Sequence, residues 1–170
     1  MINNIKIPKA KEIGHSKVIT LKEDNSAFEM ISIFEKFNIS SAPVINDCCE
    51  VVGFVAEGDL FKVLEESLFF DEQRIPNVGE IMETKVMFAK PDWNIFELDD
   101  FFTFNNLRCA PIVDSENILI SFVTKKQLFK SLVKLTKDRF VHIKNLNEPI
   151  ALSMYQKVGS ILEGRVDNKS

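Results

Sequence analysis

The residues able to carry acid–base, nucleophilic or metal chemistry are few in this 170-residue chain. Its two histidines, His15 and His142, stand far apart, and neither has metal-ligand spacing with the three cysteines. Adjacent Cys48 and Cys49 are poorly placed to bridge each other, so we expect reduced thiols. No glycine-rich phosphate loop or nucleophile elbow occurs, and residues 159–164 fit neither pattern. We therefore expect neither catalysis nor a bound metal.

A second set of polar residues is suited to binding. Arg108 carries a guanidinium group, and Lys125 and Lys126 add positive charge beside Thr124. Each also has a purely structural interpretation. Asp59 would complement the dipole at a helix start, and Thr124 would be an N-cap. Arg108 would be a solvated surface charge or a dimer contact, and the two lysines would form a solvated helix face. Both interpretations stay open at this point.

The elements that must position these residues form an internal repeat. Residues 39–47 reappear as residues 107–115, and their prolines, Pro43 and Pro111, stand 68 residues apart. Four further matches keep that offset without a gap: Lys17-Val18 with Lys85-Val86, Phe28-Glu29 with Phe96-Glu97, Phe54-Val55 with Phe122-Val123, and Leu60-Phe61-Lys62 with Leu128-Phe129-Lys130. A repeat of roughly 50–60 residues buries too little surface to be stable alone, so the pair is expected to fold together.

Charge and hydropathy exclude several classes of partner. The net charge of −4 and the pI near 5.3 argue against nucleic acid or an anionic membrane surface, because both require clustered lysine and arginine. The N-terminus has no apolar run typical of a signal peptide, and no stretch is long enough to span a bilayer. We expect a soluble, cytoplasmic protein.

Both copies show the same order of expected elements: strand, helix, strand, strand, helix. In the first copy, capping residues Ser26 and Glu29 begin a helix that ends near Asn38. Asn94 and Glu97 do the same in the second. The expected strands are 17–21, 42–45, 51–56 and 86–89, with a second hairpin over 110–124; the later helices are 57–68, 95–104 and 125–135. Outside the copies we expect a helical turn over 9–13, a short strand at 141–143 and a helix over 149–162.

This order, with the paired Ala-Pro-Val/Ile segments and the Leu-Phe-Lys helices, resembles a tandem pair of cystathionine-β-synthase (CBS) domains, or Bateman module. The resemblance implies an α+β fold of two β-α-β-β-α repeats packed as a pseudo-twofold pair, with a C-terminal helical extension. We divide the chain into a first repeat (11–68), a linker (69–78), a second repeat (79–136) and the extension (137–170). Family members commonly form homodimers through helices of both repeats and regulate a partner enzyme, transporter, channel or attached domain.

The resemblance also implies clefts for adenine nucleotides or adenosyl ligands, with AMP, ADP, ATP and S-adenosylmethionine as candidates and no cofactor. An adenosine needs an apolar slot for its base, backbone groups at the base edge, and polar groups for ribose and phosphate. The implied ligand-binding residues in the first repeat are Val18, Ile19, Ile39, Ser40, Ser41, Pro43, Ala56 and Asp59. Those in the second are Val86, Met87, Leu107, Arg108, Cys109, Pro111, Thr124 and Gln127.

Neither copy keeps the family's whole hydroxyl-x-x-Asp motif. Ala56-Glu57-Gly58-Asp59 keeps the acid without the hydroxyl, whereas Thr124-Lys125-Lys126-Gln127 keeps the hydroxyl without the acid. We expect one occupied cleft, in which Asp59 faces Ser40 and Ser41 and binds ribose while the other repeat helps with phosphate. Cys109 is expected to be a small buried residue. The alternative is a ligand-free interaction scaffold whose degenerate clefts are filled by side chains.

Overall fold

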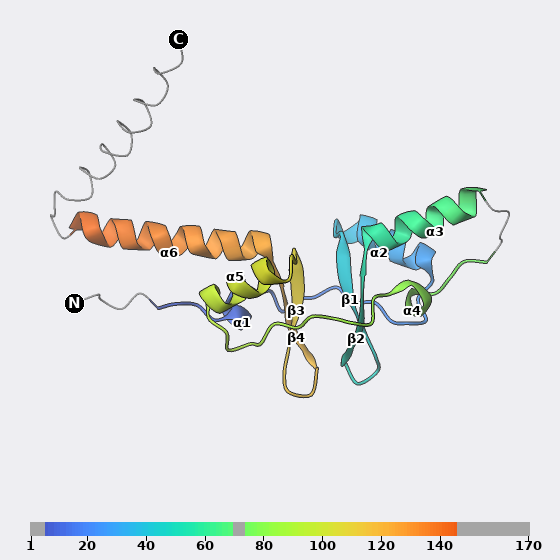
Figure 1. The fold of residues 1–170 in the computed structure, drawn as a ribbon, viewed down its shortest axis with the longest axis horizontal. Coiled ribbons are helices and arrows are strands. Elements are labelled where there is room, and N and C mark those ends of the chain that lie inside the picture. Colours follow the sequence, from blue (N-terminus) through green and yellow to red (C-terminus); the bar gives the residue numbers. More distant parts are fainter. Residues whose placement is uncertain (1–5, 70–73, 146–170) are drawn as a thin grey trace, which may run out of the picture. The chain divides into compact units, whose positions relative to one another are not determined.

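The computed structural model describes residues 6–69 and 74–145 (Figure 1). The chain divides into two compact units. One unit comprises residues 7–131, and the described residues 6 and 132–145 belong to the other. The first unit contains both repeats apart from the end of the last helix, after residue 131. Among the residues that the structure describes, every helix is too short or too polar to span a lipid bilayer.

Each repeat contains a short leading helix, a longer helix, a β-hairpin and a final helix. The first repeat has α1 (Ala10–Ile13), α2 (Ala27–Phe37), β1 (Ser41–Ile45), β2 (Val51–Ala56) and α3 (Glu57–Phe69). The second has α4 (Val78–Ile81), α5 (Ile95–Phe104), β3 (Cys109–Val113), β4 (Leu119–Thr124) and α6 (Lys125–Asn145). Residues related by the 68-residue offset are called counterparts below. The expected mixed fold of two repeats is confirmed.

Capping residues begin the helix that precedes each hairpin, α2 and α5, as the sequence predicts. The Ser26 hydroxyl accepts a hydrogen bond from the Glu29 N–H at 3.2 Å, and the Glu29 carboxylate accepts one from the Ser26 N–H at 2.7 Å. In α5 the Asn94 carboxamide oxygen accepts from Glu97 N–H at 3.2 Å, and Glu97 reciprocates at 2.7 Å. Asn38 ends α2 in the left-handed conformation (φ 50°), which asparagine tolerates well.

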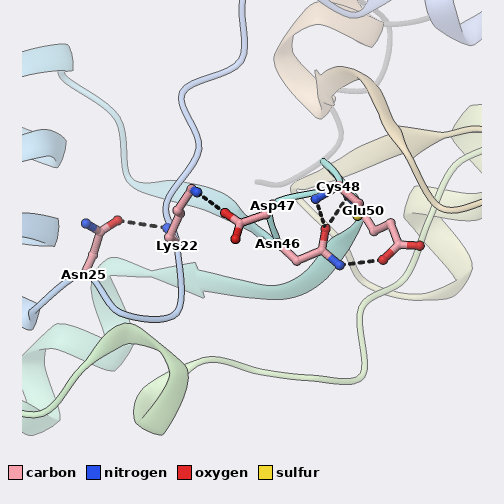
Figure 2. Close-up of polar contacts among 6 residues, drawn as sticks. All are labelled: Lys22, Asn25, Asn46, Asp47, Cys48 and Glu50. Carbon is pink, nitrogen blue, oxygen red and sulfur yellow. Dashed lines mark hydrogen bonds and ion pairs between the residues drawn. The ribbon is translucent and has the colours of Figure 1, made fainter.

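Both hairpins are two-stranded and antiparallel, and their registers are equivalent. Pro43 pairs with Phe54, and Pro111 pairs with Phe122. Figure 2 shows how the first hairpin loop is held: the Asn46 carboxamide oxygen accepts from the N–H groups of Cys48 and Glu50 at 2.9 and 3.0 Å. These bonds add to two backbone hydrogen bonds in the same turn, from the Asn46 N–H to the Glu50 carbonyl and from the Cys49 N–H to the Asn46 carbonyl, both of 3.0 Å.

The strands expected at residues 17–21 and 86–89 are absent from the structure. Each segment contributes one parallel bridge instead, Leu21 with Val44 and Ala89 with Ile112. The Leu21 N–H donates to the Pro43 carbonyl at 3.1 Å. Because each segment makes only this one bridge, its other residues do not pair with a strand. The side chains of its β-branched residues can therefore line a pocket.

Three other expectations differ from the structure or lie outside it. Residues 141–143, expected as a strand, continue α6, because neither proline nor glycine interrupts the chain after Lys125 until Pro149. The helix α4 was not expected, although its counterpart α1 matches the turn predicted over residues 9–13. The helix expected over residues 149–162 lies outside the described residues.

The two repeats exchange their leading segments. The first core is formed by Leu21, Ala27, Met30, Phe34, Ala42, Val44, Val55, Leu60 and, from α4, Val78. The counterparts of all nine residues are also buried, and α1 with Ala10 contacts α5 and β4. Equivalent hydrogen bonds fix both leading segments: Ala10 N–H to the Trp93 carbonyl at 2.7 Å, and Val78 N–H to the Asn25 carbonyl at 2.8 Å. Each core is therefore completed by the other repeat.

Three pairs of counterparts contact each other directly. Ser41 Oγ lies 3.4 Å from Cys109 Sγ, and the rings of Phe54 and Phe122 stack with centroids 6.2 Å apart. Glu50 and Ile118 form an antiparallel bridge. Because a residue meets its own counterpart only at a twofold axis, these pairs define the pseudo-twofold axis of the repeats.

Candidate functional site

One pocket, of about 400 Å³, lies between the two repeats. Its lining comprises His15, Val18, Ile19, Asn38, Ile39, Ser40, Ser41 and Pro43, together with Phe122, Thr124 and Lys126. We call it the inter-repeat pocket. Its volume falls within the range of roughly 300–1,000 Å³ that is common for small-molecule sites.

The first repeat supplies the apolar wall of the inter-repeat pocket. Val18 and Ile19 are half-buried in the extended segment before Leu21, and Ile39 lies where α2 gives way to β1. Ser40 and Ser41 follow with small side chains, so the wall stays open beside them. Six implied ligand residues, Val18, Ile19, Ile39, Ser40, Ser41 and Pro43, thus line one pocket.

The second repeat closes the pocket from β4 and the start of α6. His15 and Phe122 exchange two backbone hydrogen bonds, of 3.0 and 3.1 Å, and their rings meet edge to face with centroids 6.1 Å apart. This contact anchors the segment before Val18 onto β4. Thr124 and Lys126, a hydroxyl-bearing and a basic residue, then complete the lining.

Gln127 forms a small hydrogen-bond network beside these residues. Its Oε1 accepts from the N–H and the hydroxyl of Thr124, at 2.7 and 3.0 Å, and the Gln127 N–H donates to Thr124 Oγ1 at 3.2 Å. Its Nε2 lies 2.8 Å from His15 Nδ1. The structural interpretation of Thr124 as a helix cap therefore holds, and Thr124 also belongs to the lining of the pocket.

Asp59 is not among the residues that line this pocket, although we expected it to face Ser40 and Ser41. Its carboxylate accepts a hydrogen bond from the Ala56 N–H at 2.8 Å, at the start of α3. It also lines a separate pocket of about 390 Å³, together with Lys62, Val63, Pro76, Glu80 and Ile81. The first-repeat wall thus meets the motif of the second repeat, because the repeats pack crosswise around the pseudo-twofold axis.

The other implied residues also lie outside the lining of the inter-repeat pocket: Ala56, Val86, Met87, Leu107, Arg108, Cys109, Pro111 and Gln127. Arg108 is exposed, and its carbonyl accepts from the Lys125 N–H at 2.8 Å. Cys109 contacts Ser41 at the axis. Burial raises the pKa of the Cys109 thiol, and the Ser41 hydroxyl partly offsets this.

Sequence reasoning missed three lining residues, His15, Asn38 and Phe122. A usable signal existed for Phe122, because it stands two residues before Thr124 and alternate strand residues share a face. His15 has Glu83 as its counterpart, so the repeat gave no hint of a shared role. Within the described ranges, no three acidic, histidine or cysteine side chains gather in a way that could hold a metal ion.

A second surface feature lies between α2 and α3. A groove of about 390 Å³ is lined by Ile31, Phe34, Glu35, Asn38, Ile39, Glu57, Leu60, Phe61 and Leu64. Phe61 is 65% exposed there, and its counterpart Phe129 on α6 is 66% exposed. The two final helices therefore present matching aromatic side chains to solvent.

The comparisons with known proteins agree with this geometry. The profile described as "CBS domain" matches residues 10–66 and 78–134, more than half of the chain. The protein MJ1426 of Methanocaldococcus jannaschii is 30% identical over 146 residues, which cover 69% of this chain and 87% of that protein. Other curated relatives are longer, and the chain spans between 13% and 60% of their lengths.

Solved structures of CBS-domain pairs share the fold. The pair of protein MJ0100 in complex with 5-methylthioadenosine and S-adenosyl-L-methionine superposes with a TM-score of 0.65 and 23% identity, covering 75% of this chain and 98% of that one. CBSX2 in complex with AMP gives a TM-score of 0.67 and 17% identity, with the same coverage. The two matched segments, the crosswise cores and the paired hairpins lead to one conclusion: this chain belongs to the CBS-domain family and carries two CBS domains in tandem.

Proposed function

We propose that the chain is a regulatory module that binds an adenine nucleotide or adenosyl ligand in the inter-repeat pocket and signals to a partner protein. The observation that carries the proposal is the composition of that pocket, which combines an apolar slot and a small wall from one repeat with a hydroxyl and a cation from the other. The adenosyl ligands named for MJ0100 and CBSX2 support the choice of ligand class.

The pocket suggests how such a ligand would lie. The adenine ring fits the slot formed by Val18, Ile19 and Ile39, and backbone groups near Ser40 read its edge. The Ser40 carbonyl already accepts a hydrogen bond from Glu57 N–H at 3.0 Å, so its orientation is fixed before the ligand arrives. Thr124 and Lys126 would face the ribose and phosphate.

Regulation follows from the two-sided construction of the pocket. Because its walls belong to different repeats, a ligand would favour the relative arrangement of repeats that it binds most tightly. The size of any signal is limited by the difference in affinity between the two arrangements. The module itself needs no catalytic residue for this role.

Thermal-shift and calorimetric titrations with AMP, ADP, ATP and S-adenosylmethionine test the proposal. A ligand at 100 times its Kd should stabilise the protein by about 2.7 kcal/mol. Ser40→Trp, which fills the pocket from its small wall, should abolish this stabilisation. Ser32→Trp on the exposed surface of α2 is the matched control. The proposal fails if no compound stabilises the wild-type protein at millimolar concentration, or if Ser40→Trp has no more effect than the control.

Asp59→Ala separates the two candidate places for the ligand. Binding in the inter-repeat pocket should survive this change, because Asp59 lies in a different pocket. A loss of affinity with Asp59→Ala and Arg108→Ala, but not with Ser40→Trp, would assign the ligand to the residues around Asp59 instead.

A ligand-free scaffold is the competing proposal, and the hydrogen bonds of the motif residues favour it. Asp59 caps α3 through Ala56 N–H, and Gln127 caps α6 through Thr124, so both are already engaged without a ligand. A scaffold would give no thermal shift with any adenosyl compound. It would still form complexes through its exposed helices.

We also propose that the chain forms a homodimer through the final helices of both repeats. The groove between α2 and α3 and the exposed Phe61 and Phe129 provide apolar surface for such an interface. Light scattering on the full chain should give a dimer, and Phe61→Asp with Phe129→Asp should give a monomer. A monomeric wild-type protein at micromolar concentration would contradict this proposal.

A further inference from the structure

The exposed Phe61 of α3 has acidic neighbours. Glu57 stands four residues before it and Glu65 four residues after it, and this spacing places all three on one face of the helix. Phe61 and Glu57 also line the groove between α2 and α3, where the other charged residue is Glu35. The lysine of α3, Lys62, lines a different pocket. Among the described residues, the groove is therefore lined by apolar and acidic side chains without a basic one.

The counterpart of Phe61 on α6, Phe129, has basic neighbours instead. Lys125 and Lys126 stand four and three residues before it on the same helix, and both are exposed. Residues 125–133 contain three lysines and no acid, a net charge of +3. Their counterparts, residues 57–65, contain three acids and one lysine, a net charge of −2. The final helices thus repeat the aromatic side chain and reverse the charge around it.

The charge difference extends to the residues that line the groove. These nine residues include two acids and no base, whereas their nine counterparts include one acid, Asp99, and one base, Lys125. In the part of the chain that the structure describes, no ion pair involves the charged residues that flank the two phenylalanines: Glu57, Glu65, Lys125 and Lys126. These charges are therefore available to a partner molecule.

We infer that a second copy of the chain docks in a crossed arrangement, in which α3 of each copy faces α6 of the other. The inference rests on the homodimer proposed above and specifies which surfaces meet in it. Crossed docking brings the acidic groove with Phe61 against Phe129 and its lysines, so each contact is both apolar and attractive. The alternative, with α3 facing α3 and α6 facing α6, brings like charges together in both contacts. A twofold axis makes the two crossed contacts identical, so the assembly closes as a dimer.

The salt dependence of the dimer tests the inference without any substitution. Analytical ultracentrifugation of the wild-type full chain gives the dimer dissociation constant from low to physiological ionic strength. This constant should rise with salt, because screening weakens the attraction between exposed opposite charges. A constant that falls with salt would show like charges in contact and would overturn the crossed arrangement.

Lys125→Glu tests the contact itself. It turns both crossed contacts from attractive to repulsive and should weaken the dimer roughly tenfold. Adding Glu57→Lys restores opposite charges and should return the dissociation constant to within about threefold of wild type. Lys11→Glu, on the exposed surface of α1, makes the same change in net charge and should have no effect. A thermal melt shows that each variant is folded, and the salt titration of the wild type provides the test if one is not.

Mixing the wild-type chain with the double variant Glu57→Lys/Lys125→Glu gives the decisive comparison. In a crossed mixed dimer, Glu57 meets the carboxylate introduced at position 125, so native mass spectrometry should show mixed dimers well below their random share. Mixed dimers at or above that share would overturn the crossed arrangement and leave the homodimer in place. A monomeric wild-type chain would refute the homodimer as well. Neither result affects adenosine binding, which the ligand titrations measure separately.

Discussion

The exchange of leading segments between the repeats makes Val78 a sensitive position. This residue belongs to α4 of the second repeat, yet it is 0% exposed within the core of the first. Val78→Ala removes two methyl groups, a transfer loss of about 1.6 kcal/mol at roughly 0.8 kcal/mol per buried methylene. The residual cavity adds to that loss, so we expect a destabilisation of about 2–3 kcal/mol.

Differential scanning calorimetry or denaturant unfolding measures this effect directly. For a chain of this length the melting temperature should fall by roughly 4–12 °C, at about 2–4 °C per kcal/mol. The control is Ile75→Ala, three residues earlier and 46% exposed, which should cost less than about 1 kcal/mol. If the two variants lose equal stability, or if Val78→Ala is neutral, Val78 does not complete the first core and the exchange is refuted.

Three further predictions concern caps, thiols and acid stability. Asn94→Ala should cost about 1 kcal/mol in chemical unfolding, because α5 loses its N-cap; an unchanged midpoint would contradict this. In a thiol-labelling assay at pH 8, Cys48 and Cys49 are exposed and should react first, whereas burial raises the pKa of Cys109 and should make it slowest. The backbone hydrogen bond from Ser26 lowers the pKa of Glu29 below 4.5, so its stabilisation is present above that pH and is lost as pH falls through the lowered value. Glu29→Gln should flatten the acid limb of stability against pH, and an unchanged limb would refute the assignment.

The longer elements of each repeat were predictable because their signals are local. The capping pairs that begin α2 and α5 lie three residues apart, and the hairpin loop at residues 46–50 is rich in turn formers. These signals involve near neighbours, so no tertiary information is needed. The predicted helix starts and hairpins are accordingly confirmed.

The expected outer strands failed for a non-local reason. The run before Leu21 has strand composition, but β-propensity reports how a residue fits a pleated surface, not whether a partner is present. Only Leu21 finds one, at Val44, and Val18 and Ile19 line the inter-repeat pocket instead. The strand expected at residues 141–143 failed because a helix with no stop signal continues through β-branched residues.

The sequence predicted most residues of the candidate site, but not how the two repeats bring them together. Seven of its residues, including Ile39, Ser41 and Thr124, were identified from the motifs of the two repeats. Which wall meets which motif depends on the crosswise packing, and nothing within one repeat encodes that choice. The split of the motif between Asp59 and Thr124 could be read from the sequence, but the fold was needed to show that these two residues line different pockets.

The exchanged leading helices also determine how the module loses its structure. Opening the first core releases Val78 together with the chain that leads into the second repeat, and opening the second core releases Ala10 in the same way. Because each core contains a segment of the other repeat, opening one core alone has a high free-energy cost. Residues 7–131 should therefore behave as one cooperative unit in hydrogen exchange. Damage confined to either repeat would then lower the protection of amides in both.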